Sequence, residues 1–258
     1  MLKRIAALPP ETLANYNVSS VQHLSVGAAP VPYSLKESVC EHCGEHCLTE
    51  SYGSTENGMV TRLAPDMQRK KPGPSGKPYA QVAIEVRDND DNGLCRNQTG
   101  ELWIRTPTTL GQYLNGKLLD TDTMDAKGFF RVGDVGHVDE DGYLYITDRA
   151  NDLIISGGAN LYPVEIETAI IKHPAIQDVA VIGIPDDEFG EQVKGFCELK
   201  PGTHTTTNAA QTFLTDRLAS DNGPKSIDFV DRLPRNTMGK LLKRELRESY
   251  WKDRERKE

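Results

Sequence analysis

The sequence predicts an α/β fold with two parts, on the basis of three observations. Residues 1–80 alternate short apolar strands with a helix, and residues 81–148 contain strands with apolar side chains at every second position. From residue 151 helices and strands alternate to the end of the chain. We therefore expect one domain over residues 1–150 and a smaller α+β domain over residues 151–258, about 108 residues long and near the usual domain size.

The first segment has a strand–helix–strand order. An apolar strand is expected over residues 21–27, a helix over residues 32–43 that stops at Gly44, and a second strand over residues 46–53. Because parallel strands need a long, usually helical, crossover, this order predicts a mostly parallel sheet. The Pro- and Gly-rich run KPGPSGKP at residues 71–78 predicts the loop that separates this sheet from the next segment.

The second segment reads as a set of antiparallel strands. The turn-forming runs DNDDNG and DEDG join strands whose apolar residues alternate with polar ones. These features predict a small β-barrel or a curled sheet. The expected strands cover residues 82–88, 100–106, 129–138 and 143–149.

The third segment mixes helices and strands. A short strand over residues 152–156 and a loop over residues 157–163 lead to a helix, for which Pro163 suits the first position. A second helix is expected over residues 208–220. Further strands are expected over residues 178–186, 193–200 and 226–234.

Composition excludes several classes of protein. The chain has 258 residues, with 30 Lys+Arg against 38 Asp+Glu and a net charge of −8, which argues against a nucleic-acid partner. It has no apolar run of the roughly 18 residues that a transmembrane helix needs, and no pattern typical of a signal peptide. Residues 232–258 carry 10 Lys+Arg and 5 Asp+Glu. This excess indicates either an anionic ligand such as a phosphate or, for most of these residues, a solvated helix with charge pairs.

The cysteines do not predict disulfides. Five cysteines, an odd number in a chain of this length, favour a reducing environment, so we expect a cytoplasmic protein. The run CEHCGEHC at residues 40–47 is dense in potential zinc ligands, but structural zinc sites usually separate two ligand pairs by a longer loop. We expect weak, adventitious metal binding there if any occurs.

Five short motifs carry the functional information. Each is unspecific alone, but their order and spacing together resemble the adenylate-forming superfamily, over about Val21 to Glu248. The stretch SGGANLYPVEIE is most similar to the acyl- and aryl-CoA ligase branch; peptide-synthetase adenylation domains come second and luciferase-like oxygenases third. The five motifs are GAAP (27–30), YGSTE (52–56), VGD (132–134), DRANDLIISGGANLYPVEIE (148–167) and PRNTMGK (234–240).

The resemblance implies a fold and a reaction. The fold would be the C-terminal part of the large adenylate-forming domain, a parallel-sheet layer plus a small β-barrel, followed by a mobile α+β C-terminal domain. In the reaction a carboxylic acid attacks the α-phosphate of ATP to give acyl-AMP and pyrophosphate, and the thiol of CoA then displaces AMP. Because negative charge gathers on the transferring phosphoryl group, the first half needs Mg²⁺ and a positioned cation.

The same resemblance assigns residues in the large domain. Glu56 matches the Mg²⁺-binding position, Thr55 matches a phosphate contact, and Tyr52 matches the aromatic residue beside adenine. Asp134 matches the carboxylate that accepts the ribose hydroxyls. The remaining nucleotide-binding positions are Gly27, Ala28, Ala29, Pro30, Gly53 and Arg149.

The resemblance also assigns roles to residues of the mobile C-terminal domain. Lys240 matches the lysine that bridges the acyl carboxylate and the phosphate, which suits a compact cation on a flexible stem. Gly157 and Gly158 match the loop along which the pantetheine arm of CoA passes, and Asn160 matches a position that faces the nucleotide. The hinge falls on Asn151, where the family usually has Asp or Lys.

One departure from the family is an absence. About 26 residues precede GAAP, and no Gly-rich phosphate loop occurs in the sequence. The chain therefore resembles the C-terminal half of a ligase, and a missing N-terminal half is an expected partner. The alternative from another class is a non-catalytic nucleotide- or partner-binding fragment that complements or regulates such a half.

Overall fold

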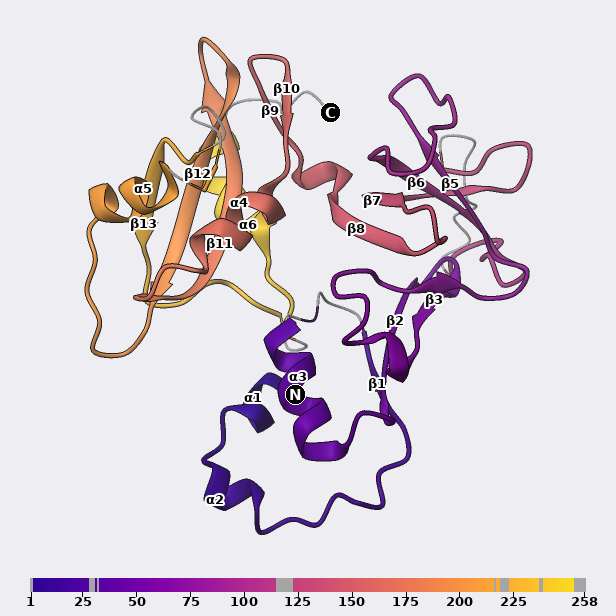
Figure 1. Cartoon of the computed structure of the whole chain (residues 1–258). Helices are drawn as coiled ribbons and strands as arrows, with labels where there is room; N and C mark the ends of the chain where they lie inside the picture. The colour runs from indigo at the N-terminus through magenta and orange to yellow at the C-terminus, as the bar shows by residue number, and fades with distance from the viewer. Residues whose placement is uncertain are drawn as a thin grey trace. The chain divides into compact units, whose positions relative to one another are not determined.

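The structure, a computed structural model, divides the chain into two compact units, Met1–Ile146 and Thr147–Glu258. The elements of each unit can be followed by colour and label in Figure 1. The α/β class expected from the sequence is confirmed. The structure describes residues 2–27, 31, 33–114, 123–215, 217–218, 223–236 and 239–252.

The first sheet of the first unit is mixed, with strand order β1-β2-β3-β4. Only β1 and β2 are parallel, while β2/β3 and β3/β4 are antiparallel. The sequence predicted the parallel pair and the crossover helix, but the expectation of a mostly parallel sheet was wrong, because β3 and β4 return antiparallel. Strand β4 also lies inside the run 71–78, which was expected to be a loop. The elements are α1 (Leu2–Ala6), α2 (Pro10–Leu13), β1 (Leu24–Val26), α3 (Tyr33–Cys43), β2 (Leu48–Ser54), β3 (Gly58–Leu63), the 3₁₀ turn η1 (Pro65–Met67) and β4 (Lys77–Pro78).

Helix α3 ends where the sequence predicts. Gly44 takes a positive φ of 94°, and its amide donates to Cys40 O at 2.9 Å, the usual geometry of a glycine that terminates a helix. Val39 and Cys40 on α3 pack against Leu48 of β2, all of them buried. This small core therefore joins the crossover helix to the strand that follows it.

The second sheet of this unit has the order β5-β6-β7-β8. Pairs β5/β6 and β6/β7 are antiparallel, and a turn closed by Asp139 and Tyr143 joins β7 to β8. Val86, Leu102, Val138 and Leu144 form its buried core, because alternate side chains of each strand lie on one face. The strands are β5 (Ala83–Arg87), β6 (Gly100–Arg105), β7 (Phe130–Val138) and β8 (Leu144–Arg149).

The second unit is built on β11 and β12, a long antiparallel pair. Val179 and Val181 of β11 pack in the same cluster as α4 and α5, whereas Ala180 and Ile182 pack in a cluster with α6. Both faces of β11 are thus covered, which explains its nearly continuous apolar run. The elements are η2 (Ala150–Asp152), β9 (Ile154–Ser156), β10 (Ala159–Leu161), α4 (Pro163–Ile170), β11 (Ile176–Asp186), β12 (Gly190–Leu199), α5 (Thr207–Thr215), β13 (Ser226–Phe229) and α6 (Lys243–Trp251).

Three expectations for this unit were wrong in detail. The segment 157–163 is not wholly a loop, because Ala159–Leu161 form β10, which pairs with β9. The second helix ends at Thr215 instead of residue 220, and the last strand ends at Phe229. The C-terminal helix has no buried residue, as expected for a largely solvated helix with charge pairs, while its Leu246 and Tyr250 pack against the core beneath α6.

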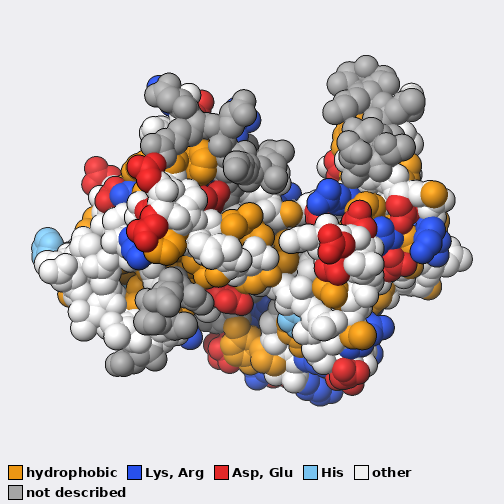
Figure 2. Space-filling view, turned by 90° about the horizontal axis from the view of Figure 1, so that it is seen from above, with side chains coloured by type: hydrophobic (Ala, Val, Ile, Leu, Met, Phe, Trp, Pro, Cys, Tyr) orange, Lys and Arg blue, Asp and Glu red, His pale blue; other side chains and the backbone are white. Residues whose placement is uncertain are grey.

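Within the described part of the chain, no helix is long and apolar enough to cross a membrane. On the face shown in Figure 2, acidic and basic side chains lie among one another.

Candidate nucleotide and acyl-transfer site

The YGSTE motif lies at the turn that joins β2 to β3. The β2/β3 register shifts between Tyr52 and Gly53, so the strand bulges there. A Cβ atom on Gly53 would lie 2.1 Å from Gly58 O, so only glycine fits at this point. The bulge ends the ladder and places exposed Thr55 and half-buried Glu56 in the turn that follows it.

Glu56 is held on both its backbone and its side chain by the segment after β6. Leu110 N donates to Glu56 O at 2.6 Å, and the Tyr113 hydroxyl donates to Glu56 Oε1 at 2.8 Å. The hydrogen bond to Glu56, with a smaller contribution from burial, raises the pKa of Tyr113. The carboxylate is therefore held in one orientation before any ligand arrives.

Three threonines anchor the next residue of the same turn. The hydroxyls of Thr106 and Thr108 donate to Asn57 O at 2.9 and 3.0 Å, and that of Thr109 donates to Asn57 Oδ1 at 3.1 Å. Asn57 is fully buried, so these bonds fix its backbone firmly. This segment and Tyr113 could not be predicted from the sequence, because no local pattern links them to the YGSTE motif.

Asp134 of β7 lies beside Tyr52 of β2. The Tyr52 hydroxyl donates to Asp134 Oδ2 at 2.6 Å, and Asp134 is only 5% exposed. The two residues are 82 positions apart in the chain, and Tyr52 packs against the buried core of the second sheet, so the packing of the two sheets brings them together. A short hydrogen bond to a buried carboxylate is among the stronger kinds, so it fixes both side chains.

Gly27 follows β1 directly. A Cβ atom there would lie 2.6 Å from Ser51 O of β2, so the small residue allows β1 and β2 to approach closely. The next three residues of the motif, Ala28, Ala29 and Pro30, lie outside the described residues.

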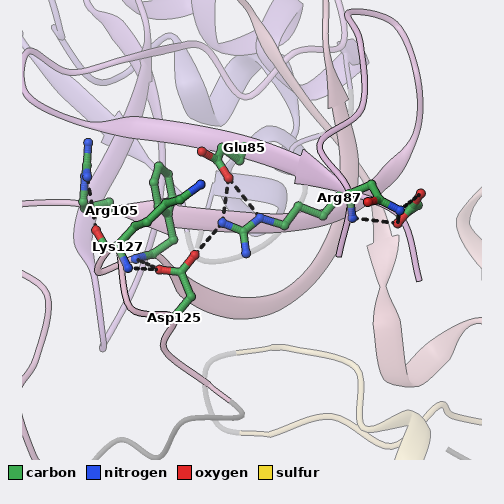
Figure 3. Close-up of polar contacts among 8 residues, drawn as sticks. Glu85, Arg87, Arg105, Asp125 and Lys127 are labelled. Carbon is green, nitrogen blue, oxygen red and sulfur yellow. Dashed lines mark hydrogen bonds and ion pairs between the residues drawn. The ribbon is translucent and has the colours of Figure 1, made fainter. Parts of the chain in front are cut away.

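A buried arginine fixes the segment that enters β7 (Figure 3). Arg87 donates from Nε and Nη2 to Glu85 Oε2 at 2.9 and 2.6 Å, and from Nη2 to Asp125 Oδ2 at 2.6 Å. Its guanidinium lies 4.2 Å from the centre of the Trp103 ring. Asp125 Oδ1 in turn accepts the amides of Lys127 and Phe129. Burial alone would raise the pKa of Asp125, but Arg87 and these two amides outweigh it and lower the pKa.

In the second unit the two glycines of SGGANLYPVEIE form the turn of the β9/β10 hairpin. Gly157 and Gly158 have φ values of 57° and 84°, as a two-residue hairpin turn of this kind requires. Gly157 N donates to Phe189 O at 2.8 Å, which joins the hairpin to the β11–β12 turn. Asn160 is exposed on β10, where it pairs with Ile155. A Gly-Gly pair between two short apolar runs is itself a hairpin signal, so the sequence contained this information.

Asp148 links β8 to helix α4. It is 5% exposed, and its Oδ2 accepts the Val164 amide at 3.0 Å while its Oδ1 accepts the amide of Arg149 at 2.8 Å. The carboxylate therefore satisfies an amide in the first turn of α4, a position that favours negative charge. Arg149 itself is exposed and precedes η2, which contains Asn151.

Lys240 lies in a short loop whose base is closed by a bridge between Arg235 and Leu241. Asn236 Oδ1 accepts the Lys240 amide at 2.9 Å, and Gly239 takes a positive φ of 86°. Arg235 pairs with Asp178 at 2.5 Å, which ties the loop to β11. Lys240 is exposed at the end of this anchored loop.

The structure thus divides the expected site residues between the two units. In the first, Tyr52 and Asp134 are in direct contact and Glu56 lies in the turn after Tyr52, whereas the second carries Arg149, Asn151, Gly157, Gly158, Asn160 and Lys240. Within the described ranges, no three His, Cys, Asp or Glu side chains gather closely enough to hold a metal ion, and this includes CEHCGEHC. Its Cys40 and Cys47 are buried thiols, and burial, the largest effect, raises the pKa of Cys40.

Solved structures of adenylate-forming enzymes share this architecture of a mixed α/β body followed by a small α+β unit. The AMP-binding enzyme family model matches residues 1–114, and the model of the AMP-binding enzyme C-terminal domain matches residues 165–240. The chain belongs to the AMP-binding enzyme family.

Its relatives are ligases about twice its length. The long-chain-fatty-acid–CoA ligase of Bacillus subtilis (strain 168) is 35% identical over 95% of this chain and 43% of its own length. The 2-succinylbenzoate–CoA ligase of Bacillus licheniformis is 36% identical over 88% of this chain and 46% of its own. The crystal structure of ATP-bound MatB from Rhodopseudomonas palustris matches with a TM-score of 0.85 and 33% identity, over 98% of this chain and 49% of that one. The chain therefore spans about half the length of the proteins it matches.

Proposed function

We propose that this chain supplies the C-terminal half of an ATP-dependent acyl- or aryl-CoA ligase. The observation that carries the proposal is the contact between Tyr52 and Asp134, with Glu56 held in the turn that follows. The ring of Tyr52 suits a purine, and the buried carboxylate of Asp134 suits the hydroxyls of a ribose. The half-buried carboxylate of Glu56 suits a metal ion bound to phosphate. The substrate class is supported by the two Bacillus relatives described above, because their names give a long-chain fatty acid and 2-succinylbenzoate as the acids joined to CoA.

The nucleotide would bind in the first unit. Asp134 accepts the ribose hydroxyls, Tyr52 lies against adenine, and the backbone of Gly27 and Gly53 lies beside the base. Thr55 contacts the phosphate. Because Asp134 already accepts the Tyr52 hydroxyl, the ring and the carboxylate are oriented before binding, which lowers the entropy that binding costs.

The residues fit a magnesium ion at Glu56. Mg²⁺ is usually held by one or two carboxylates together with substrate phosphates, and keeps several waters. Glu56 is half-buried and its orientation is fixed through Oε1 by Tyr113. When bound, the ion would neutralise charge on the phosphates during adenylation.

The second unit would serve both halves of the reaction. Lys240 lies between the acyl carboxylate and the α-phosphate during adenylation, with Arg149 and Asn160 near the nucleotide. After rotation at Asn151, the Gly157–Gly158 turn lies along the pantetheine arm, and the CoA thiol displaces AMP from the acyl carbon. The anchored but exposed loop of Lys240 suits a cation that must enter and leave the site.

The proposal is tested by supplying the acyl-AMP intermediate directly. An aromatic and a long-chain acyl-AMP are each incubated with the chain and CoA, and AMP and the thioester are quantified by mass spectrometry. This reaction needs no phosphate loop. The proposal is supported if the chain forms the thioester and Asp134→Asn lowers the rate about 10- to 100-fold, as expected for loss of a charged hydrogen-bond acceptor. The matched control is Asp90→Asn, which changes an exposed carboxylate in a turn.

No thioester from a folded chain would favour the alternative function, a non-catalytic nucleotide- or partner-binding fragment. The native mass then discriminates further. A fragment that complements or regulates an N-terminal half should be recovered in a heavier complex that contains it.

Lys240 should act in one half-reaction. With the upstream half supplied, Lys240→Met should slow ATP-dependent acyl-AMP formation about 10²- to 10³-fold, because one preorganised charge on the developing phosphorane is lost. Thioester formation from acyl-AMP should change little. ATP–pyrophosphate exchange and the thioester assay measure the two halves, with exposed Lys252→Met as the control; equal losses in both halves would contradict this role.

A further inference from the structure

Helix α6 covers one face of β11 and is held to that strand near both its ends. β11 is the edge strand of the order β10-β9-β12-β11 among the described strands, so its outer backbone groups need partners. Glu167 of α4 accepts the Val181 amide at 2.7 Å and pairs with Lys243 Nζ at 2.8 Å. Burial, which outweighs Lys243 and the amide, raises the pKa of Glu167. At the other end of α6, Trp251 Nε1 donates to Gly183 O at 3.1 Å.

The middle of the same helix holds the η2 turn. Arg247 Nη1 donates to Asn151 O at 2.9 Å, and Nη2 forms an ion pair with Asp152 Oδ1. Both side chains of the ion pair are largely buried, with exposures of 16% and 21%. An arginine can satisfy two acceptors with one rigid fork, whereas a lysine offers a single point charge.

The helix also begins immediately after the Lys240 loop. Leu242 N donates to Pro234 O at 2.9 Å across the base of that loop, and α6 starts at Lys243. Arg235 ties the loop to Asp178 of β11. The loop and the η2 turn are thus attached to the same strand and helix.

We infer that Arg247 is a positioning residue that makes the η2 turn part of the rigid second unit and ties it to the Lys240 loop through α6. The carbonyl of Asn151 and the side chain of Asp152 then move with that unit. The name hinge for this turn rests on the proposed function, but the attachment itself does not.

Hydrogen exchange of the chain, without nucleotide or acid, tests the attachment. Leu153 N donates to the carbonyls of Arg149 and Ala150, each at 3.2 Å, so its amide reports on the turn. Arg247→Met should accelerate its exchange about tenfold or more, the usual effect of losing a charged hydrogen bond. Val181 and Phe196, in β11 and β12, should not change. Arg244→Met removes an exposed arginine from the same helix and should change none of these amides.

Two further variants separate positioning from general stabilisation. Arg247→Lys, which keeps the charge but not the fork, should lie between wild type and Arg247→Met. Asp152→Asn should also accelerate exchange of the Leu153 amide. In the double variant with Arg247→Met, the fold-increase in the exchange rate should be smaller than the product of the fold-increases in the two single variants.

Unchanged Leu153 exchange in Arg247→Met would overturn the inference. Equal acceleration of Leu153, Val181 and Phe196 would also overturn it, because Arg247 would then stabilise the whole unit and not the turn. Neither outcome bears on the thioester assay, so failure of the proposed function is recognised separately.

Discussion

At the scale of single residues, Lys36 and Glu50 form an ion pair inside the first unit. Their side chains are 4% and 11% exposed, and they join α3 to β2. Burial raises the pKa of Glu50; the hydrogen bond and the charge of Lys36 lower it but do not outweigh burial. A charged pair in such a place contributes little net stability, but each partner depends on the other.

Lys36→Met should therefore destabilise the first unit by about 3–5 kcal/mol at pH 7, since it leaves a buried carboxylate without its cation. The folded pKa of Glu50 lies above its unfolded value, so the folded state binds the proton more tightly. The loss of unfolding free energy caused by Lys36→Met should therefore become smaller as pH falls and Glu50 becomes neutral. Urea unfolding followed by Trp103 fluorescence in a Trp251→Phe background measures it, because Trp103 and Trp251 are the only two tryptophans.

The double variant Lys36→Met/Glu50→Gln is the control. With no charge left in the core, most of the stability should return. A cost that stays the same at every pH and in the double variant would show that packing of the Lys36 stem, and not charge, matters here.

At the scale of elements, Arg87 of β5 connects two parts of the second sheet through Asp125. The folded pKa of Asp125 lies below its usual value, so the stability it contributes is present above the unfolded pKa of about 4 and is lost as pH falls through the lower folded pKa. The cause is the same network that fixes the entrance to β7 (Figure 3).

Asp125→Asn should lower the stability of the first unit at pH 7 by about 1–3 kcal/mol, the usual value of hydrogen bonds to a charged group. Its acid unfolding curve should also become flatter than that of wild type. Urea midpoints from pH 7 down to pH 3, again by Trp103 fluorescence, measure both effects. Asp90→Asn in the β5–β6 turn should leave the curve unchanged, and parallel curves for wild type and Asp125→Asn would contradict the role of ionisation.

The β9/β10 hairpin depends on its two glycines. Alanine at Gly157 or Gly158 should cost about 1–2 kcal/mol, because both have positive φ. At Gly157 the added Cβ would also lie 3.0 Å from the Phe189 ring, whereas it meets nothing within 4 Å at Gly158. Gly223→Ala, also in open space but without a positive φ, should cost less than about 0.5 kcal/mol.

Urea unfolding followed by Trp251 fluorescence in a Trp103→Phe background measures these costs. If Gly158→Ala were as mild as Gly223→Ala, backbone strain would not be the reason for the glycine.

At the scale of the whole molecule, the second unit has its own complete core. Two buried clusters, one around Ile166 and Val181 and the other around Ile182 and Phe196, contain residues of Thr147–Glu258 alone. Domains with their own core generally fold alone.

The polypeptide Thr147–Glu258 should therefore keep its fold when produced by itself. Its ¹H–¹⁵N amide spectrum should show the wide dispersion of a folded α+β unit. A narrow, collapsed spectrum would show that the unit needs residues 1–146 to fold.

The class of fold, the family and most strands could be predicted from the sequence. Alternation of apolar and polar residues predicted β5–β8, and Pro163 predicted the start of α4. The order of the five motifs was sufficient to identify the adenylate-forming enzymes. These signals are local, since each depends on spacings of a few residues along the chain.

Which distant side chains meet depends on the packing of the folded chain and could not be predicted from the sequence. Tyr113 contacts Glu56 from 57 residues away, and Arg247 contacts Asn151 from 96. A tyrosine or an arginine at such a position has no local pattern that names its partner, because the partner depends on strand order and helix packing. The contact between the Arg247 guanidinium and the η2 turn therefore depends on the packing of α6 against β11.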